Sequence, residues 1–278
     1  GYLAKLLYGV PLVVTCHSLE PLRPWKEEQL GKGYRLSSWA EKTAIESADR
    51  VIAVSKSVKE DILRHFNVSS DRVAVIHNGI DLNKWKKTTG DYTKKRYGIE
   101  DPYVLFVGRT TRQKGMVHLL DAADYIDPGL QLVCCTCAPD TQEVEDEITQ
   151  KVAEKKNVLW INELLKEEQY IELYSGAAVF ACPSIYEPFG IINLEAMACE
   201  TPVVASAVGG IKEVVIPDET GILVEPENPK QLASGINHLL RNPALARRLA
   251  ENGRSRVERY FSWKLVAQQT KKLYEALI

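Results

Sequence analysis

Residues 179–195 read VFACPSIYEPFGIINLE, a short apolar run that leads through a polar loop into a helical pattern. Val179–Cys182 has the length and composition of a buried strand, and a helix is expected from about residue 190. The same order recurs from residue 102 onward. Strands are expected near 103–107, 130–134, 158–161, 179–182, 203–205 and 222–224, and helices near 116–126, 142–155, 167–177, 190–199 and 210–216. This alternation predicts an α/β domain with a parallel sheet covered on both faces.

The residues before 102 show a shorter version of the same alternation. Strands are expected at Val10–Cys16, Val51–Val54 and Val73–Ile76, and helices at Ser38–Ser47 and Val58–Phe66. Ser57, with Glu60 three residues later, predicts a capping box at the start of the second helix. His77-Asn78-Gly79 predicts a tight turn after the last strand, and the polar residues 82–101 predict a linker into a second domain.

Composition sets limits on the class of protein. A chain of 278 residues can form one or two domains, and 45% hydrophobic with 26% charged residues is typical of a soluble globular protein. The net charge of −2 gives no electrostatic reason to expect nucleic acid or an anionic membrane as a partner. No apolar run approaches the roughly 18 residues of a membrane span. The cytoplasm is the expected location.

The cysteines favour a structural role over metal binding. Cys134-Cys135-Thr136-Cys137 is the densest group. A zinc site needs a second such pair, or histidines at a suitable distance, and the sequence has neither. We therefore expect buried thiols and no metal site.

Two glutamates flank the helix start in the opening stretch. Gly190 and Ile191 lie where the helix begins, so their N–H groups and the positive end of the helix dipole can bind an anion such as a diphosphate. Glu187 precedes the helix and lies beside that anion. Glu195 comes round to nearly the same face about two turns further on. The alternative for the glutamates alone is a pair of solvated side chains beside a buried helix.

A basic loop follows the strand expected at 103–107. It reads Gly108-Arg109-Thr110-Thr111-Arg112-Gln113-Lys114-Gly115. Arg109 and Lys114 stand at the C-terminal end of a strand, where open α/β sheets bind ligands, and both side chains can meet phosphate oxygens. A solvated basic loop is the alternative for this segment by itself. Two such loops in one repeating pattern favour a nucleotide site.

These segments resemble the retaining glycosyltransferases of the GT-B architecture, in glycosyltransferase family 4 and its glycogen synthase branch. Thr15–Lys26 and Thr110–Gly115 resemble more narrowly the short bacterial ADP-glucose-dependent glycogen or maltose-1-phosphate synthases. The resemblance covers essentially the whole chain. It rests on Gly108-Arg109 with Lys114-Gly115, the Glu187/Glu195 pair with Phe189-Gly190, Val75-Ile76-His77-Asn78-Gly79-Ile80-Asp81, and Gly209-Gly210 before Glu213-Val214-Val215.

The resemblance implies a GT-B fold with two Rossmann-like domains. Residues 1–98 would form the C-terminal part of an acceptor-side domain, which is incomplete because the family has a longer N-terminal domain. Residues 99–261 would form a complete donor-binding domain with a parallel sheet. Residues 262–278 would form a helix that crosses back to the first domain.

The resemblance also implies roles for individual residues. Glu195 would bind the ribose hydroxyls of the donor, and Glu187 would contact the transferred glucose near its reacting centre. His17 would approach that glucose from the other domain. Asn78 would lie near the cleft. Glu20, Arg23 and Lys26 form a polar loop on the same side as His17, which either contacts an acceptor or packs as an ordinary surface loop. Gly209 either lets the backbone approach the ligand or permits a turn before the next helix.

The implied activity is a retaining glucosyltransferase without cofactor or metal. It would move glucose from ADP-glucose to an α-1,4-glucan or to glucose 1-phosphate. A transferase of the same fold that uses UDP-glucose or GDP-mannose is one alternative, and an inactive nucleotide-binding fragment is another. A dinucleotide enzyme is disfavoured because the loop at 108–115 lacks the G-x-G-x-x-G pattern.

Overall fold

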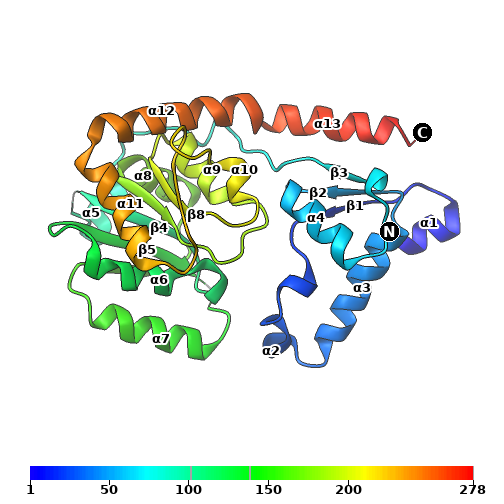
Figure 1. Cartoon of the computed structure of the whole chain (residues 1–278), viewed down its shortest axis with the longest axis horizontal. Helices are drawn as coiled ribbons and strands as arrows, with labels where there is room; N and C mark the ends of the chain where they lie inside the picture. Colours follow the sequence, from blue (N-terminus) through cyan, green and yellow to red (C-terminus); the bar gives the residue numbers. More distant parts are fainter. Residues whose placement is uncertain (101, 138, 278) are drawn as a thin grey trace. The chain divides into compact units, whose positions relative to one another are not determined.

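The computed structural model describes residues 1–100, 102–137 and 139–277, which form two compact units. The smaller unit contains Gly1–Gly79 together with the segment from Trp263, and the larger contains Ile80–Ser262. Each unit has its own sheet, in which all paired strands are parallel, with helices packed around it (Figure 1). The α/β class predicted from the sequence is confirmed.

The sheet of the larger unit has the order β6-β5-β4-β7-β8-β9. Its strands are β4 Tyr103–Arg109, β5 Gln131–Cys137, β6 Val158–Asn162, β7 Val179–Cys182, β8 Val203–Ser206 and β9 Ile222–Val224. This is the strand order of a doubly wound sheet, and the direction of winding reverses between β4 and β7. Ligands of such sheets bind at the carboxyl ends of the strands beside that reversal.

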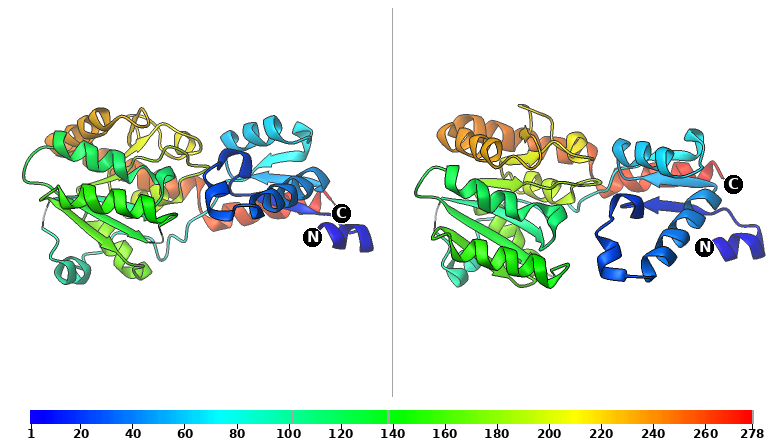
Figure 2. Two further views of the ribbon diagram at one scale, coloured as in Figure 1. Left: turned by 90° about the horizontal axis from the view of Figure 1, so that it is seen from below. Right: turned by 60° about the horizontal axis from the view of Figure 1, so that its bottom comes forward.

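Helices cover both faces of this sheet, as Figures 1 and 2 show. Phe106 and Ala181 face a buried cluster formed with α6, α7 and α11, whereas Phe180 points to the other face and packs edge-to-face on Tyr174 of α8. The helices are α5 Tyr92–Tyr97, α6 Met116–Ala122, α7 Gln142–Ala153, α8 Glu167–Gly176, α9 Ile191–Ala198, α10 Ile211–Val214, α11 Pro229–Arg241 and α12 Pro243–Tyr260, with the 3-10 helices η3 Arg112–Lys114 and η4 Ala123–Tyr125.

The smaller unit has the sheet order β1-β2-β3. The predicted strand at 10–16 starts only at Val13, and the helix predicted from Ser38 already starts at Gly33. The strands are β1 Val13–Cys16, β2 Arg50–Ala53 and β3 Val73–Val75. The helices are α1 Tyr2–Tyr8, α2 Lys26–Leu30, α3 Gly33–Ser47, α4 Lys56–His65 and α13 Trp263–Glu275, with η1 Glu20–Leu22 and η2 Ser70–Arg72.

The cap of α4 corrects a prediction. Ser55, not Ser57, is the N-cap, and its hydroxyl accepts a hydrogen bond from the N–H of Val58 at 3.0 Å. Ser55 has extended backbone angles and Ser57 already lies inside the helix. The capping-box prediction was wrong by two residues because both serines precede the apolar stripe, and only Ser55 lies outside the helix, where an N-cap must be.

The predicted linker is partly structured and belongs to the larger unit. It contains α5, where the N–H and hydroxyl of Thr93 donate to Glu172 on α8 at 2.8 and 2.6 Å. Trp85 packs edge-to-face on Tyr174 of the same helix. The units therefore divide after residue 79 and again after residue 262, whereas the predicted boundaries followed residues 98 and 261. Residue 101 of the predicted linker and residue 278 of the predicted last segment lie outside the described residues.

The predicted turn at residues 77–79 does not form. The chain continues from β3 into Ile80, which forms a parallel bridge with Ser262 and donates its N–H to the carbonyl of Phe261 at 2.9 Å. Gly79 instead allows a close approach. A Cβ at this position would lie 3.1 Å from the backbone nitrogen of Trp263, a tight contact that a larger residue would relieve only if the neighbouring segment shifted slightly.

None of the helices in the described part of the chain combines the length and the hydropathy that a membrane span requires.

Candidate active site

The two loops that the sequence analysis singled out lie side by side in the larger unit. The strands before them pair directly, with Val104 opposite Val179 and Leu105 opposite Phe180. Because the pairing is parallel, the loops after β4 and β7 leave the same edge of the sheet. The pairing brings Arg109 and Lys114 to the same edge as Glu187, at the reversal of winding.

Backbone contacts join these loops. The N–H of Ile185 donates to the carbonyl of Gln113, and the side-chain Nε2 of Gln113 donates to the backbone carbonyl of Tyr186, both at 2.9 Å. Gly115 has φ 69°, and a Cβ there would lie 2.0 Å from the carbonyl oxygen of Pro183. Any other residue at 115 would push the loops apart. The two loops are therefore held together by hydrogen bonds and close packing.

An ion pair connects the loops through their charged side chains. Nζ of Lys114 lies 2.6 Å from Oε2 of Glu187, and these side chains are only 16% and 9% exposed. The hydroxyl of Ser184 donates to the same carboxylate oxygen at 3.3 Å. The pair holds an ammonium group at the carboxyl edge of the sheet. A phosphate oxygen that entered here would compete with Glu187 for that ammonium.

The start of α9 lies directly after Glu187. Gly190 is the N-cap residue in the left-handed conformation, with φ 92°, and it provides no capping side chain. A Cβ on Gly190 would lie 2.8 Å from the side-chain Nδ2 of Asn193. Ile191, the first helical residue, is exposed. The first turn of α9 thus presents N–H groups and the positive end of its dipole beside the ion pair.

A third loop holds Glu187 from behind. The N–H of Gly210 donates to the carbonyl of Glu187 at 3.0 Å. Gly209 has φ 47°, and a Cβ there would lie 2.1 Å from the same carbonyl oxygen. The sequence analysis left open whether Gly209 serves a ligand or a turn. In the structure it lets the loop after β8 pack against the backbone of Glu187.

Glu195 lies on α9, half-buried, and accepts a hydrogen bond on Oε2 from the hydroxyl of Tyr174 at 3.0 Å. Burial raises the pKa of Glu195 to about 7, and the nearby Glu167 acts in the same direction, while the Tyr174 hydrogen bond and the charge of Lys114 oppose the rise. The carboxyl group therefore changes its charge near neutral pH. Sequence reasoning missed Tyr174, because a tyrosine on the buried side of α8 is indistinguishable from an ordinary core residue.

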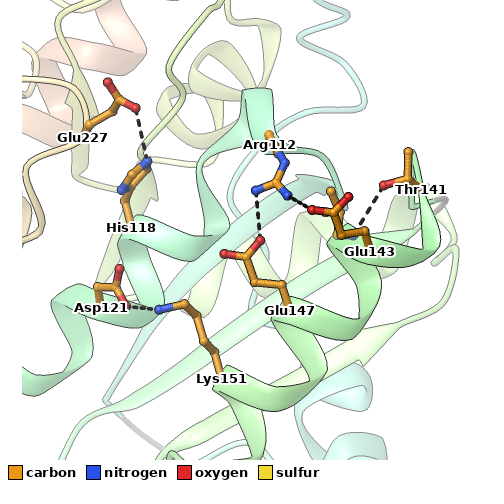
Figure 3. A network of polar contacts seen from close by, with 9 residues as sticks. Arg112, His118, Asp121, Thr141, Glu143, Glu147, Lys151 and Glu227 are labelled. Carbon is orange, nitrogen blue, oxygen red and sulfur yellow. Dashed lines mark hydrogen bonds and ion pairs between the residues drawn. The ribbon is translucent and has the colours of Figure 1, made fainter. Parts of the chain in front are cut away.

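The arginines of the basic loop differ in their surroundings. Arg109 is half-exposed and makes a long contact of 3.4 Å with Asp140. Arg112 instead bridges Glu143 and Glu147 on α7, at 2.9 Å to each (Figure 3). Arg112 thus fastens the loop to α7. Arg109 keeps more freedom to meet a ligand.

Four predicted residues lie after β1 in the smaller unit. His17 is exposed. Glu20 is buried and accepts from Nζ of Lys26 at 2.8 Å, and Arg23 donates to the hydroxyl of Ser18 at 2.5 Å. These contacts order the loop that follows β1. Whether Glu20, Arg23 and Lys26 also contact an acceptor stays a prediction.

Asn78 lies in the same unit, half-buried, after β3. The position of Asn78 near the cleft stays a prediction.

The cysteine-rich strand matches the expectation of buried thiols. Cys134 and Cys135 are buried in β5, and burial raises the pKa of the Cys134 thiol to about 12. Within residues 1–100, 102–137 and 139–277, no three His, Cys, Asp or Glu side chains are grouped so that they could hold a metal ion.

Comparison with known proteins adds sequence and structural relatives. Residues 92–256 match the family model of glycosyl transferases group 1, and residues 1–84 match that of glycosyltransferase family 4. The chain is 47% identical over 290 residues to an alpha-maltose-1-phosphate synthase of Mycolicibacterium smegmatis, with 99% of this chain and 75% of that protein covered. It is 31% identical over 278 residues to a glycogen synthase of Mycobacterium tuberculosis, covering 97% and 64%.

A solved structure shows the same fold. Sucrose-phosphate synthase from Thermosynechococcus elongatus superposes with a TM-score of 0.85 at 33% identity, which covers 100% of this chain and 70% of that one.

Proposed function

This chain belongs to the group 1 glycosyltransferases with the GT-B fold, and we propose that it transfers glucose from ADP-glucose to an α-1,4-glucan or to glucose 1-phosphate, with retention of configuration. The 47% identity to an alpha-maltose-1-phosphate synthase supports glucose 1-phosphate as acceptor. The 31% identity to a glycogen synthase supports a glucan. The choice of ADP-glucose rests on the resemblance of Thr15–Lys26 and Thr110–Gly115 to ADP-glucose-dependent synthases.

The observation that carries the proposal is the Lys114–Glu187 pair beside the start of α9. When the bond between sugar and diphosphate breaks, negative charge grows on the leaving group. Cationic side chains and N–H groups aimed at that charge lower the barrier. Lys114, Arg109 and the N–H groups of Gly190 and Ile191 are the groups that we assign to the diphosphate.

Entry of the diphosphate would also change the partner of Glu187. Once a phosphate oxygen takes the ammonium of Lys114, the Glu187 carboxylate is released toward the sugar. There it can stabilise a transition state with oxocarbenium character. By family resemblance, Glu195 accepts hydrogen bonds from the ribose, and His17 of the smaller unit approaches the glucose.

Calorimetric titration with ADP, UDP and GDP in the absence of divalent cations tests the donor site. We expect ADP to bind most tightly. Arg109→Ala and Lys114→Ala should each weaken ADP binding about tenfold or more, because each removes a charge-assisted hydrogen bond. Arg112→Ala is the matched control, since its guanidinium is held by α7, and its affinity should stay close to that of the wild type.

The outcomes separate the alternatives. Tighter binding of UDP or GDP would point to a transferase of the same fold that uses UDP-glucose or GDP-mannose. Absence of binding by all three nucleotides would favour an inactive chain. Where ADP binds, chromatography of labelled products from ADP-glucose with glucose 1-phosphate or a glucan then identifies the acceptor.

A further inference from the structure

Glu195 depends on one neighbour for its orientation. Within the described residues, its carboxylate accepts a single hydrogen bond, from the hydroxyl of Tyr174 to Oε2 at 3.0 Å. This contact crosses from α8 to α9, two helices that pack against each other. Oε1 is then the oxygen of Glu195 left for another donor group.

Tyr174 is itself fixed on several sides. Its side chain is fully buried and packs edge-to-face on Phe180 of β7 and on Trp85, with ring centroids 5.2 and 5.9 Å apart. Its carbonyl accepts a hydrogen bond from the hydroxyl of Thr201 at 2.6 Å. A ring held in this way can present its hydroxyl in one direction only. The position of Oε2 of Glu195 is therefore set by the core of the larger unit.

The charged surroundings of Glu195 come from several elements. From α8, Tyr174 donates its hydrogen bond, and Glu167 adds a negative charge. Lys114 contributes a positive charge from the loop after β4. Cys199 is the C-cap residue of α9, and Arg254 of α12 donates to the carbonyl of Ala198 at 2.7 Å. Among these groups, Tyr174 is the one in hydrogen-bond contact with the carboxylate.

We propose that Tyr174 is a positioning residue for donor binding: its hydroxyl holds Oε2 of Glu195 so that Oε1 faces the ribose hydroxyls of the nucleotide. This inference rests on the proposed function, in which Glu195 accepts from the ribose. It adds that the recognition of ribose depends on a residue of the buried core that does not touch the nucleotide. The Tyr174 hydrogen bond also opposes the rise in the pKa of Glu195, since a donated hydrogen bond favours the charged form.

The test is titration of the whole chain with ADP and with 2′-deoxy-ADP between pH 6 and 9, for wild type and Tyr174→Phe. The wild type should bind ADP more weakly as the pH falls through about 7, because Glu195 then gains a proton and loses its charge. In Tyr174→Phe the pKa of Glu195 rises further, so this midpoint should move to higher pH. ADP affinity above the midpoint should fall about tenfold, and the preference for ADP over 2′-deoxy-ADP should shrink.

Tyr103→Phe is the matched control. Tyr103 is also fully buried, and its hydroxyl donates to the carbonyl of Leu173 on α8 at 2.6 Å. Its loss should lower the melting temperature much as Tyr174→Phe does, and it should leave the pH midpoint and the nucleotide preference unchanged. The phosphate groups of ADP titrate in the same way in the experiments with the wild type, Tyr174→Phe and Tyr103→Phe. A difference between the pH midpoints of these proteins therefore reports a change in the pKa of Glu195.

A double-mutant cycle sharpens the result. Tyr174→Phe should have little effect on ADP affinity in a Glu195→Ala background, because the acceptor that its hydroxyl positions is gone. The inference is overturned if Tyr174→Phe matches Tyr103→Phe in midpoint and preference, or if its effect persists in Glu195→Ala. A wild type that binds ADP and 2′-deoxy-ADP equally also overturns it. A wild type that binds no nucleoside diphosphate instead overturns the proposed function on which it rests.

Discussion

Glu187 and Glu195 flank one helix start, yet their surroundings prepare them for different tasks. Glu187 is paired with a cation that the diphosphate can take away, which frees a charged carboxylate where the sugar lies in our proposal. Glu195 is held by a neutral hydroxyl and keeps one oxygen for the ligand. The surroundings of Glu187 suit a group that acts when charge develops on the sugar in the transition state. Those of Glu195 suit a group that recognises the bound nucleotide.

Substitutions that remove the charge of Glu187 or of Glu195 should therefore change different kinetic constants. We expect Glu187→Gln to lower kcat by about a hundredfold or more with a modest change in donor KM, as for the loss of a group that stabilises the transition state. Glu195→Gln should chiefly raise the donor KM, by about tenfold. Steady-state kinetics with ADP-glucose and a fixed acceptor measure both effects. The opposite pattern would reverse the roles that we assign.

At the scale of elements, three loops hold the backbone of Glu187 and its neighbours at contact distance. The loops after β4 and β7 meet at Gly115, and the loop after β8 meets Glu187 at Gly209. At each meeting point the neighbouring backbone leaves no space for a Cβ atom. The position of Glu187 is thus determined by elements that are distant in sequence.

Gly209→Ala should consequently damage both folding and turnover. The new methyl group would fall 2.1 Å from the carbonyl oxygen of Glu187, so the loop must shift. We expect a loss of roughly 3 kcal/mol in the free energy of unfolding, from backbone strain and overpacking together, and a clear fall in kcat. Denaturant titration and kinetic assays measure the two effects.

Gly98→Ala separates the effect of backbone strain at positive φ from the effect of a steric clash with Glu187. Gly98 has φ 64° and open space where a Cβ would stand, so this variant should lose only about 1 kcal/mol and keep its turnover. Equal losses in the two variants would show that packing against Glu187 is unimportant.

Prediction of individual elements succeeded where the signal is local. The strands at 179–182 and 222–224 have the predicted bounds, since short apolar runs are bordered there by turn residues. It failed where two local signals compete, as Ser55 and Ser57 do for the cap of α4. It also failed where a distant partner decides: α5 forms within the expected linker because Thr93 is bound by Glu172, which lies far along the chain.

At the scale of the whole molecule, the order of the strands was beyond the reach of sequence reasoning. Periodicity predicted the loops at 108–115 and 183–190 separately. Their adjacency follows from the pairing of β4 with β7, which depends on packing across the entire sheet. The same limit explains why Lys114 and Glu187 were predicted as site residues but not as an ion pair.

The charges of the larger unit lead to a prediction about metal ions. The acidic groups beside the assigned diphosphate site already face cations, since Glu187 pairs with Lys114 and Asp140 lies against Arg109. In our proposal, the positive charge that a divalent ion supplies in many transferases is provided by these side chains and by the start of α9. ADP should therefore bind with the same affinity, within about twofold, in EDTA and in excess magnesium. Calorimetry under both conditions measures this, with Lys114→Ala as the variant in which magnesium has most room to compensate. If the binding of ADP to the wild type disappears in EDTA and returns only with magnesium or manganese, then a metal ion carries the charge that we assign to Lys114 and Arg109.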